Sequence, residues 1–540
     1  MRWADLRSTT RHLRQLGGDL AMAARMTRDL PGYLRSPMDA DAVRQRITSQ
    51  LANRPARLLA TLEQTVYRAP GSPYAQLLKL AGCEFGDLRT LVHQEGVEGA
   101  LQILADRGVY VTGDEVKGRS VAVRGSQRFS FHPEAFDNPA VRPHLVLQTG
   151  GSGGKPGRVL YTLEYFEDWA ASFGVTLQAH DAYDADHVYW WPVPFHGMLA
   201  SARLDRVPIA WIYPLHPLPP IVRAAGTYLA FLSRLAGVSL PLPMRGDLDA
   251  PGPTVDWMAD HLATGRTLMV RTMPSTGVRA AVDAVERGKS LRGVTFLLGG
   301  EPVTEARRRQ IEAAGARLIV LYSSVESIGL TYSCAAPRAA DDVHVMLDLY
   351  GVAQRRREAV PDGPVVQASL FTTLSPTSAK IALNMELGDY AHVEERDCDC
   401  LLGQLGLRVH LSEIRSFEKL TGEGVTFARS NLETILEDVL PARFGGSGLD
   451  YQVAEEEAAN GATRLILRVD PSVGPADPDA IRNALLDALS QASAVGKYHA
   501  GLWRSAQTIE VRREPPLATR AGKVLPFHLL RQAGGAAIRR

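Results

Sequence analysis

Between about residue 75 and residue 410, short apolar runs alternate with stretches that have the spacing of surface helices. The runs 144–148, 294–298 and 317–322 are rich in Leu, Val and Ile, as buried strands are. Residues 305–314 have a helical spacing and lie between two of these runs. Because strands that alternate with helices form parallel sheets, the pattern predicts an α/β fold: a large domain with mostly parallel sheets flanked by helices.

The first 70 residues have apolar positions at helical spacing, among them Leu13, Leu16, Val43 and Ile47, with a break at Pro31. We therefore expect a helical lead-in, residues 1–70, that packs on the body. The many arginines of this segment also fit a helix on a membrane surface, but the aspartates among them favour a packed helix.

Beyond Arg415 the pattern changes to that of a smaller α+β unit. We expect a helix at 431–440, strands at 449–453 and 464–469, a helix at 479–492 and a strand near 508–512. The chain should therefore divide into the lead-in at 1–70, a large domain at 71–414 and a small domain at 415–540.

Composition narrows the classes of function. The 60 basic residues are balanced by 59 acidic ones, which leaves a net charge of +1 and none of the field that nucleic-acid binding requires. No apolar run reaches the roughly 20 residues that span a bilayer. Four cysteines are too few to stabilise 540 residues by disulfide bonds, and no signal-like segment begins the chain. We therefore expect a cytoplasmic protein, and the balanced charge favours one that acts on small molecules.

A glycine-rich segment follows the first predicted strand. Its glycines, hydroxyls and single Lys suit a loop that wraps phosphates with backbone N–H groups. It is not a Walker P-loop, because Thr149 stands where the first Gly would be and Pro156 where the Ser or Thr would be. The residues are Thr149, Gly150, Gly151, Ser152, Gly153, Gly154 and Lys155.

Two further segments end neighbouring predicted strands: Leu297–Pro302 and Leu321–Ser327. Open parallel sheets bind ligands at the carboxyl ends of their strands. We therefore expect both segments to face the same ligand as the glycine-rich loop.

With the glycine-rich loop, these segments resemble, in this order, the adenylate-forming superfamily of acyl-CoA synthetases, adenylation domains and luciferases. The phenylacetate-CoA ligase branch is most similar. The resemblance extends to Glu386–Asp389, to Arg415 and to Thr519–Lys523 near the C-terminus. It implies that the small domain is a mobile lid on the large one.

The resemblance implies a role for each of these residues. Lys155, Glu326 and Lys523 would be catalytic: Lys155 on the β- and γ-phosphates of ATP, Glu326 as the Mg²⁺ ligand, and Lys523 reaching the α-phosphate from the small domain. Gly153, Ser323 and Val325 depart from the family's usual residues. The remaining nucleotide contacts would come from Gly300, Glu301, Pro302, Tyr322, Ser323, Ser324, Asp389 and Arg415.

The segment Pro194–Gly197 resembles the one that borders the acyl pocket in this superfamily. The pocket residues would be Trp191, Phe195, His196 and Gly197, with Trp190 beside them. The alternative, that both tryptophans are ordinary core residues of a strand, has equal support.

Cys398 and Cys400 are closely spaced, and Cys334 and His344 follow the Tyr322 segment. Cys-x-Cys alone is a weak metal signal. The resemblance to zinc-carrying members of the branch implies a closed structural Zn²⁺ site of three thiolates and one imidazole.

The resemblance implies an ATP-dependent ligase that forms an acyl-AMP from a small carboxylic acid, aromatic by preference. A thiol would then accept the acyl group: coenzyme A, or the phosphopantetheine of an acyl carrier protein. Two alternatives remain: a nucleotide-binding partner protein without turnover, and an amide-forming or acyl-protein ligase for which Cys83 is the cysteine outside the zinc set.

Overall fold

The computed structural model describes a large part of the chain. The described residues are 3–148, 158–214, 218–247, 250–301, 303–358, 365–416, 421–422, 425–426, 432–457, 463–492, 500, 509–518, 524 and 526–530.

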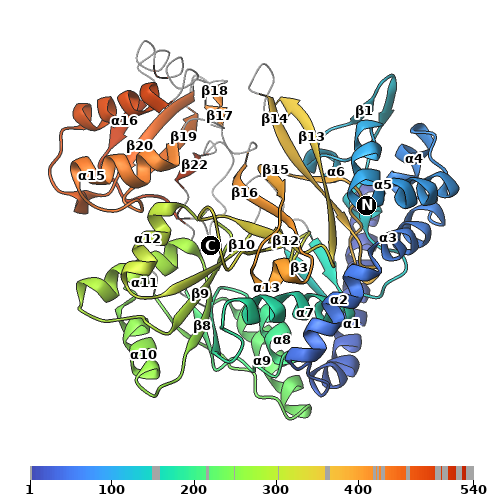
Figure 1. Cartoon of the computed structure of the whole chain (residues 1–540), viewed down its shortest axis with the longest axis horizontal. Helices are drawn as coiled ribbons and strands as arrows, with labels where there is room; N and C mark the ends of the chain where they lie inside the picture. Colours follow the sequence, from blue (N-terminus) through green and yellow to red (C-terminus); the bar gives the residue numbers. More distant parts are fainter. Residues whose placement is uncertain are drawn as a thin grey trace.

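The first large sheet has six parallel strands in the order β10-β9-β8-β5-β6-β7. Its strands are β5 (Asp186–Trp190), β6 (Ala210–Tyr213), β7 (Pro243–Arg245), β8 (Leu268–Thr272), β9 (Val294–Gly299) and β10 (Arg317–Leu321). Helices connect them: α8 (Phe195–Arg203), α9 (Pro220–Leu235), α10 (Gly252–Leu262), α11 (Pro274–Glu286) and α12 (Glu305–Ala313). The predicted strands at 294–298 and 317–322 and the predicted helix between them are confirmed (Figure 1).

The second large sheet corrects the expectation of mostly parallel sheets, because every pairing in it is antiparallel. Six residues separate the long strands β13 and β14, too few for the crossover helix that a parallel pair requires. Its order is β11-β12-β16-β15-β14-β13. The strands are β11 (Thr331–Ser333), β12 (Val343–Val345), β13 (Tyr350–Glu358), β14 (Val365–Thr373), β15 (Met385–Glu395) and β16 (Val409–Ser416).

Helix α7 (Leu163–Ala179) contacts both sheets. The Phe173 ring centroid lies 5.8 Å from that of His187 on β5 and 6.4 Å from that of Tyr332 on β11. Three side chains of this buried helix are paired with partners elsewhere in the protein. Trp169 Nε1 donates to the Tyr332 hydroxyl at 2.7 Å, and the Ser172 hydroxyl donates to a carboxylate oxygen of Asp348 at 2.7 Å. The Asp168 carboxylate accepts hydrogen bonds from Arg46, Gln50 and Ser375.

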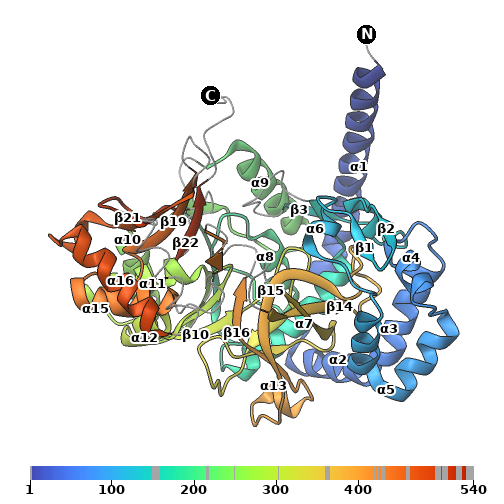
Figure 2. The same ribbon diagram turned by 90° about the horizontal axis from the view of Figure 1, so that it is seen from above.

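The N-terminal segment is helical and packs into two cores. Leu30 and Val43 are fully buried with α7 and the sheets, whereas Leu58 and Leu62 join a second core beneath β13–β15. Figure 2 shows the first turns of α1 projecting from the body. None of the described helices has the length and apolar character needed to cross a membrane. The elements are α1 (Trp3–Leu34), α2 (Ala40–Ala52), α3 (Arg54–Leu62), α4 (Pro73–Leu80), α5 (Phe85–Asp106), α6 (Gly113–Val116), β1 (Ala122–Arg124) and β2 (Gln127–Phe129).

The C-terminal part has a core of its own, centred on Leu436, Leu467 and Leu485. Its four-stranded sheet has the order β21-β20-β19-β22. The strands are β19 (Tyr451–Glu457), β20 (Thr463–Val469), β21 (Ile509–Arg512) and β22 (Phe527–Leu530), and the helices are α14 (Leu432–Thr434), the π-helix η3 (Ile435–Val439), α15 (Leu440–Phe444) and α16 (Pro478–Ala492). The single helix predicted at 431–440 is therefore three short helical segments.

A buried charge network joins the C-terminal part to α12. The Arg307 guanidinium lies 3.2 Å from Glu301 and 3.2 Å from Glu437, and the side chains of all three are at most 4% exposed. Thr304 also donates to Glu437. At the rim, Arg309 pairs with Asp438 at 2.8 Å and is 65% exposed. Figure 1 shows α12 and α15 side by side at this junction.

We predict that Arg307→Met loosens the junction, because it leaves Glu301 and Glu437 buried without a cation, at a cost of about 3–5 kcal/mol. Hydrogen exchange should become faster in residues 432–444, which contain η3. Arg309→Met is the matched control: an exposed ion pair contributes about 1 kcal/mol or less, so exchange should change little. Equal protection in the two variants would contradict a stabilising role for the buried network.

Candidate functional site

The glycine-rich segment joins the two strands of a hairpin. β3 (Leu145–Gln148) pairs antiparallel with β4 (Arg158–Tyr161), and Gln148 lies opposite Arg158. β3 confirms the predicted strand at 144–148. Several predicted site residues lie outside the described residues: Thr149, Gly150, Gly151, Ser152, Gly153, Gly154, Lys155, Pro302 and Lys523. The backbone of Arg415 pairs with Tyr390 on β16 and β15, and its side chain is outside the description.

Tyr322 and Asp389 meet where the two large sheets approach each other. Tyr322 follows β10 of the parallel sheet, and Asp389 lies on β15 of the antiparallel sheet. The Tyr322 hydroxyl donates to a carboxylate oxygen of Asp389 at 2.8 Å. The Tyr322 backbone is held at both ends by the Thr331 hydroxyl, which accepts from its N–H and donates to its carbonyl. Two residues predicted to bind one nucleotide, 67 positions apart, are thus in direct contact.

The turn after β9 brings Gly300 and Glu301 to the same edge of the parallel sheet. Gly300 has φ +89°, a left-handed conformation that glycine adopts without strain. The Glu301 carboxylate accepts from the Ser275 N–H at 3.0 Å and from the Ser275 hydroxyl at 2.8 Å, and it also pairs with Arg307. Its carboxylate is therefore occupied within the protein, and a ligand would meet the backbone of this turn.

The loop after Tyr322 presents one carboxylate. Ser324 and Ser327 are hydrogen-bonded to each other at 3.0 Å, and the Ser324 hydroxyl also accepts from the N–H of Glu326 at 3.1 Å. Ser324 therefore stabilises the loop itself. Glu326 is half-buried, and its carboxylate has no hydrogen bond or ion pair within the described part of the chain, so it is available as an oxygen ligand.

The predicted acyl-pocket residues are not all on one side of the parallel sheet. Phe195 packs edge-on against Trp211, with centroids 5.3 Å apart, and belongs to the core. A Cβ on Gly197 would lie 2.4 Å from the Tyr189 ring, so this helix turn must approach β5 closely. Trp190 is fully buried, against Gly246.

His196 and Trp191 remain as candidates for the acyl pocket. His196 lies in the first turn of α8, 5.7 Å from Trp169 between ring centroids. Its Nδ1 is buried and has no hydrogen-bond partner among the described residues. Burial lowers the pKa of His196 to about 4, with a further contribution from Arg271, so the ring is neutral at neutral pH. A neutral, unpaired imidazole can accept from or donate to a ligand.

Arg271 is a candidate site residue that sequence reasoning missed. It is a half-buried guanidinium near the carboxyl end of β8, 4.5 Å from the centre of the Trp191 ring. The available signal was one charged residue inside the apolar run 268–272. Such a residue in a central strand is unusual and often marks a ligand or an ion pair.

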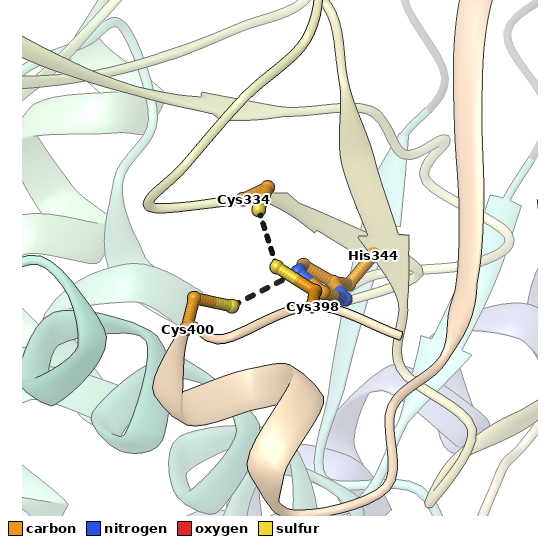
Figure 3. A group of neighbouring side chains, drawn as sticks. All are labelled: Cys334, His344, Cys398 and Cys400. Carbon is orange, nitrogen blue, oxygen red and sulfur yellow. Dashed lines mark hydrogen bonds between the residues drawn. The ribbon is translucent and has the colours of Figure 1, made fainter. Parts of the chain in front are cut away.

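Cys334, His344, Cys398 and Cys400 form a compact cluster, and their ligand atoms lie within 4.8 Å of one another (Figure 3). The Sγ atoms of Cys334 and Cys398 are 3.2 Å apart, and Cys400 Sγ lies 3.2 Å from His344 Nε2. His344 Nδ1 donates to the Leu407 carbonyl at 2.6 Å, which leaves Nε2 as the lone-pair nitrogen facing the thiols. The donor set can hold a metal ion.

A polar network supports this cluster from β16. The His410 ring centroid lies 3.9 Å from that of His344, and His410 Nδ1 is 2.8 Å from Asp342. Asp342 also accepts from Arg396 at 2.5 Å. All three side chains are at most 9% exposed, so the imidazole of His344 is held in a rigid buried setting.

Comparison with solved structures gives distant matches. A 2-hydroxyisobutyryl-CoA ligase in complex with 2-HIB-AMP and CoA is 15% identical, over 88% of this chain and 89% of that one, with a TM-score of 0.46. ATP-bound MatB from Rhodopseudomonas palustris is 15% identical over 72% and 67%, with a TM-score of 0.42. The amide bond synthetase McbA from Marinactinospora thermotolerans is 14% identical over 90% and 98%, with a TM-score of 0.41. No protein-family model and no curated protein matches the chain.

Proposed function

We propose that this chain is an ATP-dependent ligase that activates a small carboxylic acid as its acyl-AMP. In this reaction a carboxylate oxygen of the acid attacks the α-phosphorus of ATP, and the bond to the bridging oxygen breaks so that pyrophosphate leaves. A thiol, of coenzyme A or of a carrier-protein phosphopantetheine, then attacks the acyl carbonyl and AMP leaves. The proposal places the chain in the adenylate-forming superfamily, nearest its phenylacetate-CoA ligase branch.

The contact between Tyr322 and Asp389 carries the proposal. A tyrosine ring suits the flat apolar face of a purine, and a carboxylate suits the paired hydroxyls of a ribose. These two groups are 2.8 Å apart between their oxygens, although they come from different sheets. The base and the ribose of a nucleoside are joined covalently, so the residues that bind them must lie side by side, as Tyr322 and Asp389 do.

The other polar residues fit the phosphate end of the same ligand. Glu326 has a carboxylate without a partner among the described residues, and it follows Tyr322 by four positions. It would hold Mg²⁺, which neutralises triphosphate charge when bound. Lys155 and Lys523 would supply positive charge at the β,γ- and α-phosphates, an assignment that rests on the sequence resemblance.

The setting of Cys83 argues against an acyl transfer through this chain's own thiol. Cys83 is 3% exposed, within the core formed by α3–α6. Burial raises the pKa of the Cys83 thiol, which disfavours the nucleophilic thiolate. An external thiol acceptor is therefore favoured.

The test is pyrophosphate release from MgATP with a panel of aryl, fatty and amino acids. We predict that Lys523→Ala lowers release about 100-fold, because it removes a charge that acts on the transition state. Asp389→Asn should weaken nucleotide binding about 10-fold, because a charge-assisted hydrogen bond is lost. Lys79→Ala, at an exposed position on α4, is the matched control and should behave as wild type.

The same assay separates adenylation from the partner-protein alternative. A nucleotide-binding protein without turnover would bind ATP with the same sensitivity to Asp389→Asn and release no pyrophosphate with any acid. That result would overturn the ligase proposal.

We further propose that the cluster of Cys334, His344, Cys398 and Cys400 holds a structural Zn²⁺ ion. Three thiolates and one imidazole form a closed tetrahedral set with no position for substrate. The ligands come from the ends of β11 and β15 and from β12, so the ion would tie the chain after β15 to the body. His344 Nε2 and the three sulfurs would be the ligand atoms.

We predict about one zinc ion per purified chain by elemental analysis. Cys400→Ser should lower zinc content to background and lower the thermal midpoint, because binding energy of the ion contributes to folding. Cys83→Ser is the matched control, since it removes a buried cysteine outside the cluster and should keep the zinc. Wild-type protein that neither contains zinc nor takes it up after reduction would refute the assignment.

A further inference from the structure

Arg271 lies among the ends of three neighbouring parallel strands. Its guanidinium stacks on Trp191, which follows β5, with 4.5 Å to the ring centre. Its Nη1 donates to the carbonyl of Leu297 on β9 at 3.1 Å. A Cβ on Gly299 would lie 3.0 Å and 3.1 Å from the two terminal nitrogens, so the glycine leaves the space that the guanidinium fills. The side chain is thus held in one place by the sheet.

Arg271 is incompletely paired. A guanidinium carries several N–H donors, and within the described residues the Leu297 carbonyl is its one hydrogen-bond acceptor. No carboxylate of the described chain forms an ion pair with it, in contrast to Arg307, which contacts two. Burial lowers the pKa of Arg271 to about 10, so the group remains a cation at neutral pH. A partly desolvated positive charge without a counter-ion destabilises the folded protein, and a bound anion would remove this cost.

The neighbourhood of Arg271 also offers aromatic surface and an unpaired imidazole. His196 is close enough for Arg271 to lower its pKa, and its Nδ1 has no partner within the described part of the chain. Trp169 lies beside His196 and is held by its hydrogen bond to Tyr332. A Cβ on Gly329 would lie 2.2 Å from Trp169, so the backbone presses this ring into place. Two indole rings, a fixed cation and a neutral imidazole therefore lie close to one another.

From this arrangement we infer that the acid substrate carries a second carboxylate, at the end opposite the one that is activated, and that Arg271 binds it. This inference rests on the proposed ligase function, which it deepens by naming the substrate class: short or aromatic dicarboxylic acids. The planar guanidinium can give two parallel hydrogen bonds to a carboxylate, which a neutral substituent cannot match.

The position of Arg271 fits the far end of the acid and not the nucleotide. It lies on β8, two strands from β10, after which Tyr322 follows. Two strand spacings correspond to about 10 Å. An acid whose reacting carboxylate lies near the Tyr322 loop would therefore direct its other end toward Arg271.

The test is calorimetric binding of matched acids to the full chain, with Mg²⁺ and α,β-methylene-ATP present. Each diacid is compared with its half-amide, which has the same shape and one charge less: terephthalate with 4-carbamoylbenzoate, and aliphatic diacids of increasing length with their half-amides. Wild type should prefer the diacid about 10-fold or more, the range of a charge-assisted hydrogen bond. Arg271→Met should abolish the preference and Arg271→Lys should retain part of it. Arg356→Met, at an exposed position on β13, should leave it unchanged.

Equal binding of diacid and half-amide, or a preference that survives Arg271→Met, would overturn the inference, as would binding of neither compound. Pyrophosphate release measured in parallel separates the two proposals. A diacid preference without release refutes the ligase function and leaves the carboxylate site standing. Release with monoacids, and no effect of Arg271→Met, refutes the site and leaves the ligase function standing.

Discussion

The burial of helix α7 between two sheets of different type is the constraint on which the rest of this structure depends. Of its 17 residues, 13 are buried, so most polar groups on the helix need a partner within the protein. Trp169, Ser172 and Asp168 meet this condition through bonds to the antiparallel sheet and its neighbouring loops and to α2. These bonds fix the helix to the antiparallel sheet, and the Phe173 ring packs against His187 on β5 of the parallel sheet, so α7 holds the two sheets together. The contact of Tyr322 with Asp389 is one result.

The apolar runs predicted two neighbouring strands of the parallel sheet and the helix between them, because buried strands and amphipathic crossover helices have distinct periods, whereas the run 144–148 forms an antiparallel hairpin with β4. β9, α12 and β10 lie where the pattern places them. The antiparallel sheet was not predicted, since no strand was assigned from the sequence between residues 328 and 416, and β15 carries polar residues such as Glu386, Asp389 and His392 in place of an apolar run. The segment 432–444 is divided by a π-helix that carries Glu437 to Arg307, a long-range contact that helical spacing does not encode.

For the candidate site, sequence motifs identified Tyr322, Asp389 and the Cys and His residues that the fold brings together. They could not separate residues that face a ligand from those that face the core. Phe195 and Trp190 are adjacent in sequence to His196 and Trp191, but Phe195 packs against Trp211 and Trp190 is buried against Gly246. Glu301 was grouped with a ligand-binding turn, whereas its carboxylate serves the junction with the C-terminal part. Side-chain direction is set by tertiary packing, so Arg271 became visible only in three dimensions.

Gly299 and Gly329 have a consequence for how this site can change. At each position an added methyl group would meet a side chain of the candidate pocket, Arg271 in one case and Trp169 in the other. Any larger residue at Gly299 or Gly329 would therefore displace those side chains. New specificity must come from replacement of the side chains themselves, and a library built on Trp191, His196 and Arg271 would sample more folded variants than one built on the glycines.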